Sequence, residues 1–433
     1  MKTKLAVILG SKGKFLRNPV KSISILIALV MVIFIVKCVS VALTDVFSFD
    51  GGMNAQVAQN LAGKFAYATN YDSVLFDQSI QTGLPVILPV AILFMIFGES
   101  FAAGLIVNAI YLILLAFAIK YYLKNCLKLN KFLILLAVIL LYGTHDLFKF
   151  GFGLYGEVPM AFYLVLMLIY FHKYEDVSNL KFLFMAGLFL GLGFLTKTVI
   201  LICIPAILFA AIFDFMIKQR FTQGIWSGMK RLFKEYGMFV AGFLGPVLIF
   251  EIYKLVSLGV GGYLSWWKGQ GVGILLQAGV KKGFSDTNGI YNKFTTHLGL
   301  LSSFTCISEV VITFLLLVVL LAFLAILIYG IFLFWRKRVP GDYEKTLFLK
   351  DLLILITVSL SYFGWWLLIT PTEKAWYRRI FAGCILLEIC LVLIVFLLMK
   401  YRLKLAFGQG KIPNILNSLV TVGFIGFFLQ GLA

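Results

Sequence analysis

The sequence predicts an all-α polytopic membrane protein with about eleven transmembrane helices. Hydrophobic residues make up 61% of its 433 positions and charged residues only 13%. Several apolar runs exceed the roughly 20 residues that an α-helix needs to cross the hydrocarbon core of a bilayer. A transmembrane β-barrel is excluded, because its strands would alternate polar and apolar residues.

The long apolar runs define the predicted spans, each to within a few residues. In chain order they cover residues 22–44, 101–123, 131–147, 158–172, 181–195, 198–215, 236–258, 307–334, 350–370, 379–399 and 412–432. Six basic residues precede the first run, which is long and lacks a convincing small-residue cleavage site. We therefore expect an uncleaved first span and a cytoplasmic N-terminus.

The stretch 84–98, LPVILPVAILFMIFG, is apolar but short and contains two prolines. If it crossed the membrane, the lysines between 120 and 131 and the later basic loops would change sides. The positive-inside rule therefore favours a juxtamembrane helix here, and it also explains the excess of 38 Lys and Arg over 19 Asp and Glu without a nucleic-acid partner.

This topology predicts a single integral-membrane domain over 1–433 with two long outer loops. The first, 45–100, is acidic and carries the juxtamembrane segment; the second, 259–306, is rich in glycine and aromatic residues and could face an acceptor. The six cysteines are scattered without metal-type spacing, so neither a disulfide scaffold nor a zinc site is indicated.

Two carboxylates are candidates for catalysis. Asp50 follows the first span and precedes a predicted short helix over 53–62, so it is either the N-cap of that helix or a functional acid. Glu157 stands before Pro159 at the expected start of a helix, where a carboxylate is electrostatically favoured. Both are predicted on the outer side, where two converging acids could activate a hydroxyl nucleophile.

Three cations are candidates for binding phosphate. Lys197 interrupts two charge-free apolar runs at a tight outer turn, either as a lysine that extends to the interface or as a fixed cation for a phosphate. Arg378 and Arg379 lie at the outer mouth of the tenth span, on the side that the positive-inside rule disfavours. An anionic ligand is the better reason for them.

The remaining candidates are aromatic or histidine side chains in the outer loops. Trp266 and Trp267 belong either to an interfacial aromatic belt or to a surface that stacks on a substrate sugar. His145 is more typical of a hydrogen-bonding loop residue than of a metal ligand. Acids together with phosphate-binding cations fit a transferase that uses a lipid phosphate-linked group. The alternatives are a transporter or flippase of lipid-linked sugars, or a glycan polymerase or ligase.

Four sequence blocks in order, with a weaker fifth, resemble the glycosyltransferase C superfamily, near the protein O-mannosyltransferases and the aminoarabinose transferase of lipid A. The blocks are FDGGMNAQVAQNLA, TGLPVILPVAILFMIFG at 82–98, LYGEVPMAFYLVLMLIYF at 154–171, GLGFLTKTVILICIPA and, more weakly, WYRRIFAG. The resemblance implies a bacterial inner-membrane enzyme whose active site faces outward, with a catalytic first outer loop containing juxtamembrane helices.

The resemblance also implies roles for the candidate residues. The enzyme would move a sugar, with inversion, from a polyprenyl-phosphate carrier to an acceptor hydroxyl. Asp50 would be the general base and Glu157 the second acid, while Lys197 and Arg378 or Arg379 would contact the donor phosphate.

Two positions depart from the family pattern. Gly51 stands where many relatives have a second acid, and Leu84 stands near the block where aminoarabinose transferases have a lysine. The sugar, the acceptor (protein, lipopolysaccharide, teichoic acid or another glycan) and a requirement for a divalent metal therefore stay open.

Overall fold

The computed structural model describes most of the chain between residues 48 and 406. The described residues are 36, 48–69, 74–80, 82–129, 131, 133–135, 137–138, 153–219, 225–277, 290–305, 307–335, 343–372 and 375–406. The chain divides into two compact units, Met1–Val46 and Phe47–Ala433, and all described residues except Val36 belong to the second. The predicted span 412–432, nearly all of 22–44 and much of 131–147 lie outside the described residues.

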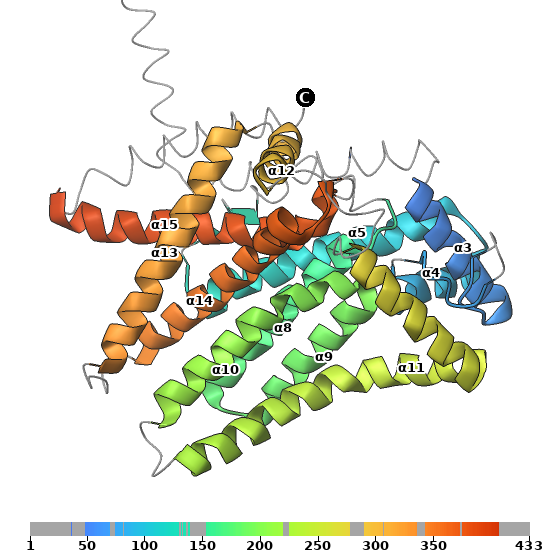
Figure 1. Ribbon diagram of the computed structural model, residues 1–433, viewed down its shortest axis with the longest axis horizontal. Coiled ribbons are helices and arrows are strands. Elements are labelled where there is room, and N and C mark those ends of the chain that lie inside the picture. The colour runs from blue at the N-terminus through green and yellow to red at the C-terminus, as the bar shows by residue number, and fades with distance from the viewer. Residues whose placement is uncertain are drawn as a thin grey trace, which may run out of the picture. The chain divides into compact units, whose positions relative to one another are not determined.

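The regular elements in the described part of the second unit are helices (Figure 1). Its elements are α3 (Phe49–Lys64), α4 (Leu84–Phe97), α5 (Phe101–Tyr121), η1 (Tyr122–Cys126), α8 (Glu157–Val177), α9 (Leu180–Thr196), η2 (Thr198–Cys203), α10 (Ile204–Gln219), α11 (Ile225–Gln277), α12 (Ile290–Thr305), α13 (Glu309–Trp335), α14 (Tyr343–Gly364), η3 (Trp365–Ile369), η5 (Tyr377–Ile380) and α15 (Phe381–Ala406). Within these residues the β structure is one isolated bridge between Ala68 and Leu75. The predicted all-α class is confirmed.

Three of the described helical stretches are long and apolar enough to cross a membrane: Phe101–Cys126, Trp226–Gly273 and Lys350–Ile369. Shorter apolar helices cover Leu84–Phe97, Leu180–Thr196, Thr198–Ile212 and Glu309–Ala325. The predicted spans between 158 and 399 coincide with helices, with ends that differ by up to seven residues, apart from the span that α11 extends further. Apolar runs of this length therefore fold as the sequence predicts.

Helices α9 and α11 pack against each other through glycines. A Cβ atom on Gly187 would lie 1.9 Å from the carbonyl oxygen of Phe239, and one on Gly191 would lie 2.5 Å from that of Phe243. The reverse contact is similar, because a Cβ on Gly242 would lie 2.0 Å from the carbonyl oxygen of Phe184. These small residues let the two backbones approach closely, as at helix interfaces in membranes generally.

The stretch 45–100, which the sequence predicts as the first outer loop, contains two helices that pack together, α3 and α4. With 14 residues, α4 is about 21 Å long, short of the roughly 30 Å hydrocarbon core. It begins with Pro85 in its first turn, where a missing N–H costs nothing, and packs on both α5 and α9. The length fits the predicted juxtamembrane helix, whose position relative to a membrane stays a prediction.

Much of the predicted outer loop over 259–306 is helical, and its side of the membrane and its role toward an acceptor stay predictions. Helix α11 continues through this stretch to Gln277 and bends at Gly259, whose φ of 66° is readily adopted only by glycine. A second helix, α12, follows from Ile290 to Thr305. Gly259 therefore bends α11 at this point. Trp266 and Trp267 lie on the part of α11 that follows the bend.

Candidate active site

Asp50 lies inside the first turn of α3 and does not cap it. The N-cap is Ser48, whose hydroxyl oxygen accepts a hydrogen bond from the backbone N–H of Gly51 at 3.3 Å. The expected helix over 53–62 therefore starts earlier, and the interpretation of Asp50 as N-cap is wrong. The carboxylate is still favoured by the positive end of the helix dipole, but it is available for another partner.

That partner is Arg378 of η5, 328 residues away in sequence. The Arg378 guanidinium donates to the Asp50 carboxylate, and the two side chains are 15% and 28% exposed. Arg378 also lies over the rings of Tyr155 and Trp376, at 5.5 and 4.8 Å from their centroids. The two aromatic rings hold the cation in place without neutralising it.

Glu157 and Lys197 form a second ion pair. Lys197 Nζ donates to Glu157 Oε1 at 2.6 Å, and the side chains are only 12% and 2% exposed. The other carboxylate oxygen, Oε2, is buried and has no hydrogen-bond partner among the described residues. Gly156 makes room for the lysine, because a Cβ there would lie 2.9 Å from Lys197 Cγ.

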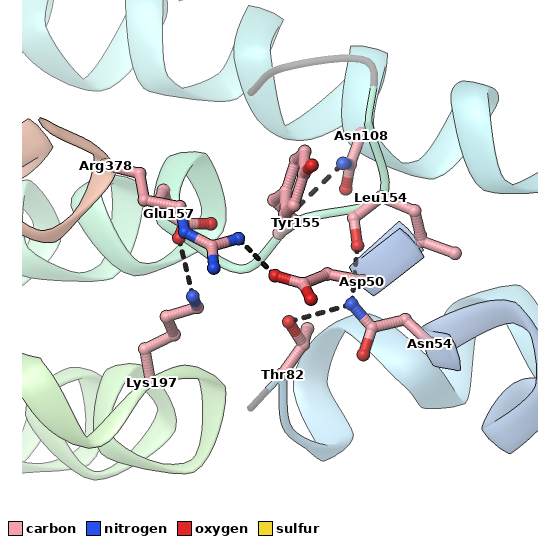
Figure 2. Close-up of polar contacts among 9 residues, drawn as sticks. All are labelled: Asp50, Asn54, Thr82, Asn108, Leu154, Tyr155, Glu157, Lys197 and Arg378. Atoms are coloured by element: carbon pink, nitrogen blue, oxygen red, sulfur yellow. Dashed lines mark hydrogen bonds and ion pairs between the residues drawn. The ribbon is translucent and has the colours of Figure 1, made fainter. Parts of the chain in front are cut away.

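The two ion pairs are brought together by the turn that precedes Glu157 (Figure 2). Leu154 adopts a φ of 54°, in the left-handed region that leucine rarely occupies. Its carbonyl oxygen accepts from Asn54 Nδ2 of α3 at 2.8 Å. On α5, the buried Asn108 amide contacts the same turn, and with its oxygen and nitrogen exchanged the oxygen would accept from the N–H groups of Leu154 and Tyr155 at 3.0 and 3.1 Å.

The block at 82–83 joins the same assembly. Thr82 Oγ1 accepts from Asn54 Nδ2 at 3.0 Å, and Gly83 N–H donates to the carbonyl oxygen of Thr196 at 3.0 Å. A Cβ on Gly83 would lie 1.5 Å from the carbonyl oxygen of Leu195, so only glycine fits. A continuous set of contacts thus runs from the helix of Asp50 to the residue before Lys197.

Arg379 adds a further cation next to Arg378. Its guanidinium lies 5.1 and 5.9 Å from the ring centroids of Trp376 and Trp365, and its buried Nη1 has no partner among the described residues. The turn η5 therefore presents two positive charges ahead of α15.

The other predicted substrate residues do not join this group. Trp266 and Trp267 belong to a cluster at the bend of α11, where Lys254 lies 3.5 Å from the Trp266 ring centroid and Glu251 accepts from Trp267 Nε1 at 3.2 Å. Trp266 Nε1 also donates to the carbonyl oxygen of Phe76 at 2.5 Å. The cluster therefore connects the segment around Phe76 to α11. His145 lies outside the described residues.

Among the residues that the structure describes, the two carboxylates of the site are paired with cations and are not arranged as ligands of a divalent metal. Each carboxylate already has a cation as its partner, and that cation would repel a metal ion placed beside it. A second acid at Gly51 has no space, because a Cβ there would lie 2.3 Å from the carbonyl oxygen of Gly153. Across the residues that the structure describes, no three His, Cys, Asp or Glu side chains are grouped to hold a metal.

Sequence reasoning missed three residues that position the site: Asn54, Asn108 and Tyr155. The available signal was weak. Asn108 is a lone amide in the apolar run 101–123, where an unpaired polar group would be costly, and Asn54 follows Asp50 by one helical turn. The two ion pairs themselves depend on contacts between segments far apart in the sequence.

Comparison with known proteins confirms part of the resemblance. Residues 86–229 match the family model described as dolichyl-phosphate-mannose-protein mannosyltransferase. The predicted resemblance is confirmed there. The match covers about a third of the chain and includes Glu157 and Lys197, while Asp50 and Arg378 lie outside it. No curated protein matches the sequence.

Several solved structures are similar over nearly the whole chain. An archaeal oligosaccharyltransferase AglB from Archaeoglobus fulgidus, in complex with an inhibitory peptide and a dolichol-phosphate, is 14% identical with a TM-score of 0.49, covering 93% of this chain and 55% of its own. ArnT from Cupriavidus metallidurans in the apo state is 11% identical with a TM-score of 0.47, covering 94% and 70%. The chain thus spans about half the length of the oligosaccharyltransferase.

Proposed function

We propose that this protein is an inverting glycosyltransferase that moves a sugar from a polyprenyl-phosphate carrier to a hydroxyl acceptor on the outer face of a bacterial inner membrane. The observation that carries the proposal is the convergence of two acids and two cations from separate elements, Asp50 with Arg378 and Glu157 with Lys197. The family match over 86–229 supports it, since that family's description names a lipid-phosphate sugar.

The chemistry is a single displacement. Asp50 takes the proton of the acceptor hydroxyl while the hydroxyl oxygen forms a bond to the anomeric carbon. The bond from that carbon to the phosphate oxygen breaks, and its electron pair leaves with the polyprenyl phosphate. Arg378 and Lys197 stabilise the negative charge that develops on this phosphate, and attack opposite the leaving group inverts the anomeric centre.

The test is transfer of a labelled sugar in proteoliposomes. Purified full-length protein is given polyprenyl-phosphate sugars with membrane extract as the source of acceptor, and released polyprenyl phosphate and labelled product are both measured. Asp50→Asn should lower transfer at least about 100-fold, because the hydroxyl loses its base. Asp77→Asn is the matched control, since it removes an acid from the same loop and should leave transfer unchanged.

The same assay separates this proposal from transport. A transporter would move the labelled sugar across the membrane without releasing carrier phosphate. Normal transfer by Asp50→Asn would show that Asp50 is not the base, and the absence of carrier release from the wild-type protein with every donor would refute the proposal.

A further inference from the structure

Both proposed acids are occupied by both proposed phosphate-binding cations. Arg378 donates to Asp50, and Lys197 donates to Glu157 Oε1 at 2.6 Å. In this arrangement Asp50 cannot serve fully as a base, because its Oδ2 is already engaged by a cation. Equally, neither cation has its charge available for a phosphate. In the structure, Asp50, Glu157, Lys197 and Arg378 are thus each held by a group of opposite charge, and Arg379 adds one positive charge beside them.

We infer that a phosphate anion displaces the two carboxylates from Arg378 and Lys197, so that the donor must bind before Asp50 can accept a proton from the acceptor. The inference rests on the proposed function and adds an order of events to it. Guanidinium and ammonium groups bind phosphate oxygens as well as carboxylates, and a guanidinium does so with two parallel hydrogen bonds. A phosphate can therefore replace both acids at the cations, and the displaced Glu157 carboxylate, which is buried, then needs a new hydrogen-bond donor such as the acceptor hydroxyl.

The side chains around the ion pairs favour replacement of the carboxylates by phosphate over addition of phosphate to the intact ion pairs. The Arg378 guanidinium is fixed over the rings of Tyr155 and Trp376, which keep it in position once Asp50 lets go. Arg379 Nη1 is buried beside it without a partner in the described chain, and can donate to the same anion. Glu157 Oε2 likewise has an unused acceptor position that can take up a hydroxyl.

The exchange has a consequence that a fixed site lacks: removing either acid should strengthen phosphate binding. In a site whose acids and cations do not compete, neutralising an acid would raise the affinity only through weaker charge repulsion, a small and screened effect that Asp77→Asn serves to measure. Because Asp50 lies partly exposed, the competition is worth a modest factor, about fivefold in the dissociation constant. The same variant that should abolish transfer should thus bind the lipid phosphate more tightly.

The experiment is calorimetric titration of purified full-length protein in detergent with farnesyl phosphate. Farnesol and inorganic phosphate are titrated in parallel, to separate the lipid tail and free phosphate from the phosphorylated lipid. Asp50→Asn should bind farnesyl phosphate about fivefold more tightly than wild type, and Glu157→Gln, which removes the acid of a buried ion pair, should tighten binding at least as much. Asp77→Asn should bind like wild type, which controls for the general loss of one negative charge.

The outcomes distinguish the two proposals. If wild type binds farnesyl phosphate and both acid variants bind it equally or more weakly, the exchange is refuted while the proposed function stands. If wild type binds farnesyl phosphate no better than farnesol, the phosphate site and the proposed function both fail. If inorganic phosphate binds as tightly as farnesyl phosphate, the site recognises free phosphate, and the proposal of a lipid-linked donor is refuted. The thermal unfolding temperature of each variant is also measured. A value equal to that of wild type shows that the substitution left the fold intact.

Discussion

At the scale of single residues, Gly51 shows why this chain departs from the family pattern. A Cβ at this position would lie 2.3 Å from the carbonyl oxygen of Gly153, in the turn that leads to Glu157. A second acid after Asp50 would therefore push α3 away from that turn. The missing side chain is what lets Asp50 and Glu157 approach each other, so the departure belongs to the geometry of this site.

We predict that Gly51→Ala lowers both transfer and stability. The added methyl group overpacks a backbone contact, which costs about 1–3 kcal/mol, and it displaces Asp50 relative to Arg378. Thermal unfolding in detergent and the transfer assay measure the two effects.

Gly63→Ala is the matched control for this substitution. It lies in the same helix with nothing within 4 Å of its Cβ, so it should be neutral or slightly stabilising. Equal behaviour of the two alanine variants would mean that contact with Gly153 does not constrain α3.

At the scale of elements, the glycine contacts between α9 and α11 fix the position of α9, the helix that leads into Lys197. The segment GLFLG at 187–191 places its two glycines one helical turn apart on the face toward α11, whose Gly242 makes the reciprocal contact. Helix α9 ends at Thr196, so its position sets that of Lys197. The close packing of α9 on α11 thus helps to position Lys197, at the end of α9, for its ion pair with Glu157.

We predict that Gly187→Ala separates these helices and reduces stability. Its Cβ would lie 1.9 Å from backbone, which cannot yield as a flexible side chain can, so the expected cost is about 2 kcal/mol. The measurement is the midpoint of thermal unfolding. Gly237→Ala on α11 has open space around its Cβ and should unfold like wild type; a Gly187→Ala protein as stable as that control would contradict the packing argument.

At the scale of the whole described unit, charges are paired at both ends of α8. Glu157 begins the helix, and about 22 Å along it His172 Nδ1 lies 2.6 Å from Asp351 Oδ2 of α14, with both side chains buried. Glu175 and Lys350 form a second pair beside them at 2.7 Å. The helix is therefore fixed to different partners at its two ends, one for the proposed chemistry and one for the fold.

We predict that Asp351→Ala lowers stability by about 2–4 kcal/mol without changing the affinity for farnesyl phosphate below the unfolding temperature. The substitution leaves the buried His172 without its partner, at the end of α8 remote from Glu157. The double variant His172→Phe with Asp351→Leu should recover much of the loss, because an apolar pair leaves no polar group unsatisfied. Thermal unfolding and calorimetric titration together check this, and a weakened affinity in the folded single variant would show that the two ends are coupled.

Sequence alone was enough to predict the helical class, the approximate limits of most apolar helices and the four charged residues, because these follow from local composition and from charge placed against an apolar background. It did not determine that Ser48 caps α3, that α11 continues past Gly259, or which acid pairs with which cation. Those depend on contacts between segments up to 328 residues apart, which the period and length of a single helix do not encode. In the folded protein, the glycine contacts and the turn at Leu154, which is held by asparagine hydrogen bonds, position these segments. Arg378 thereby pairs with Asp50, and Lys197 pairs with Glu157.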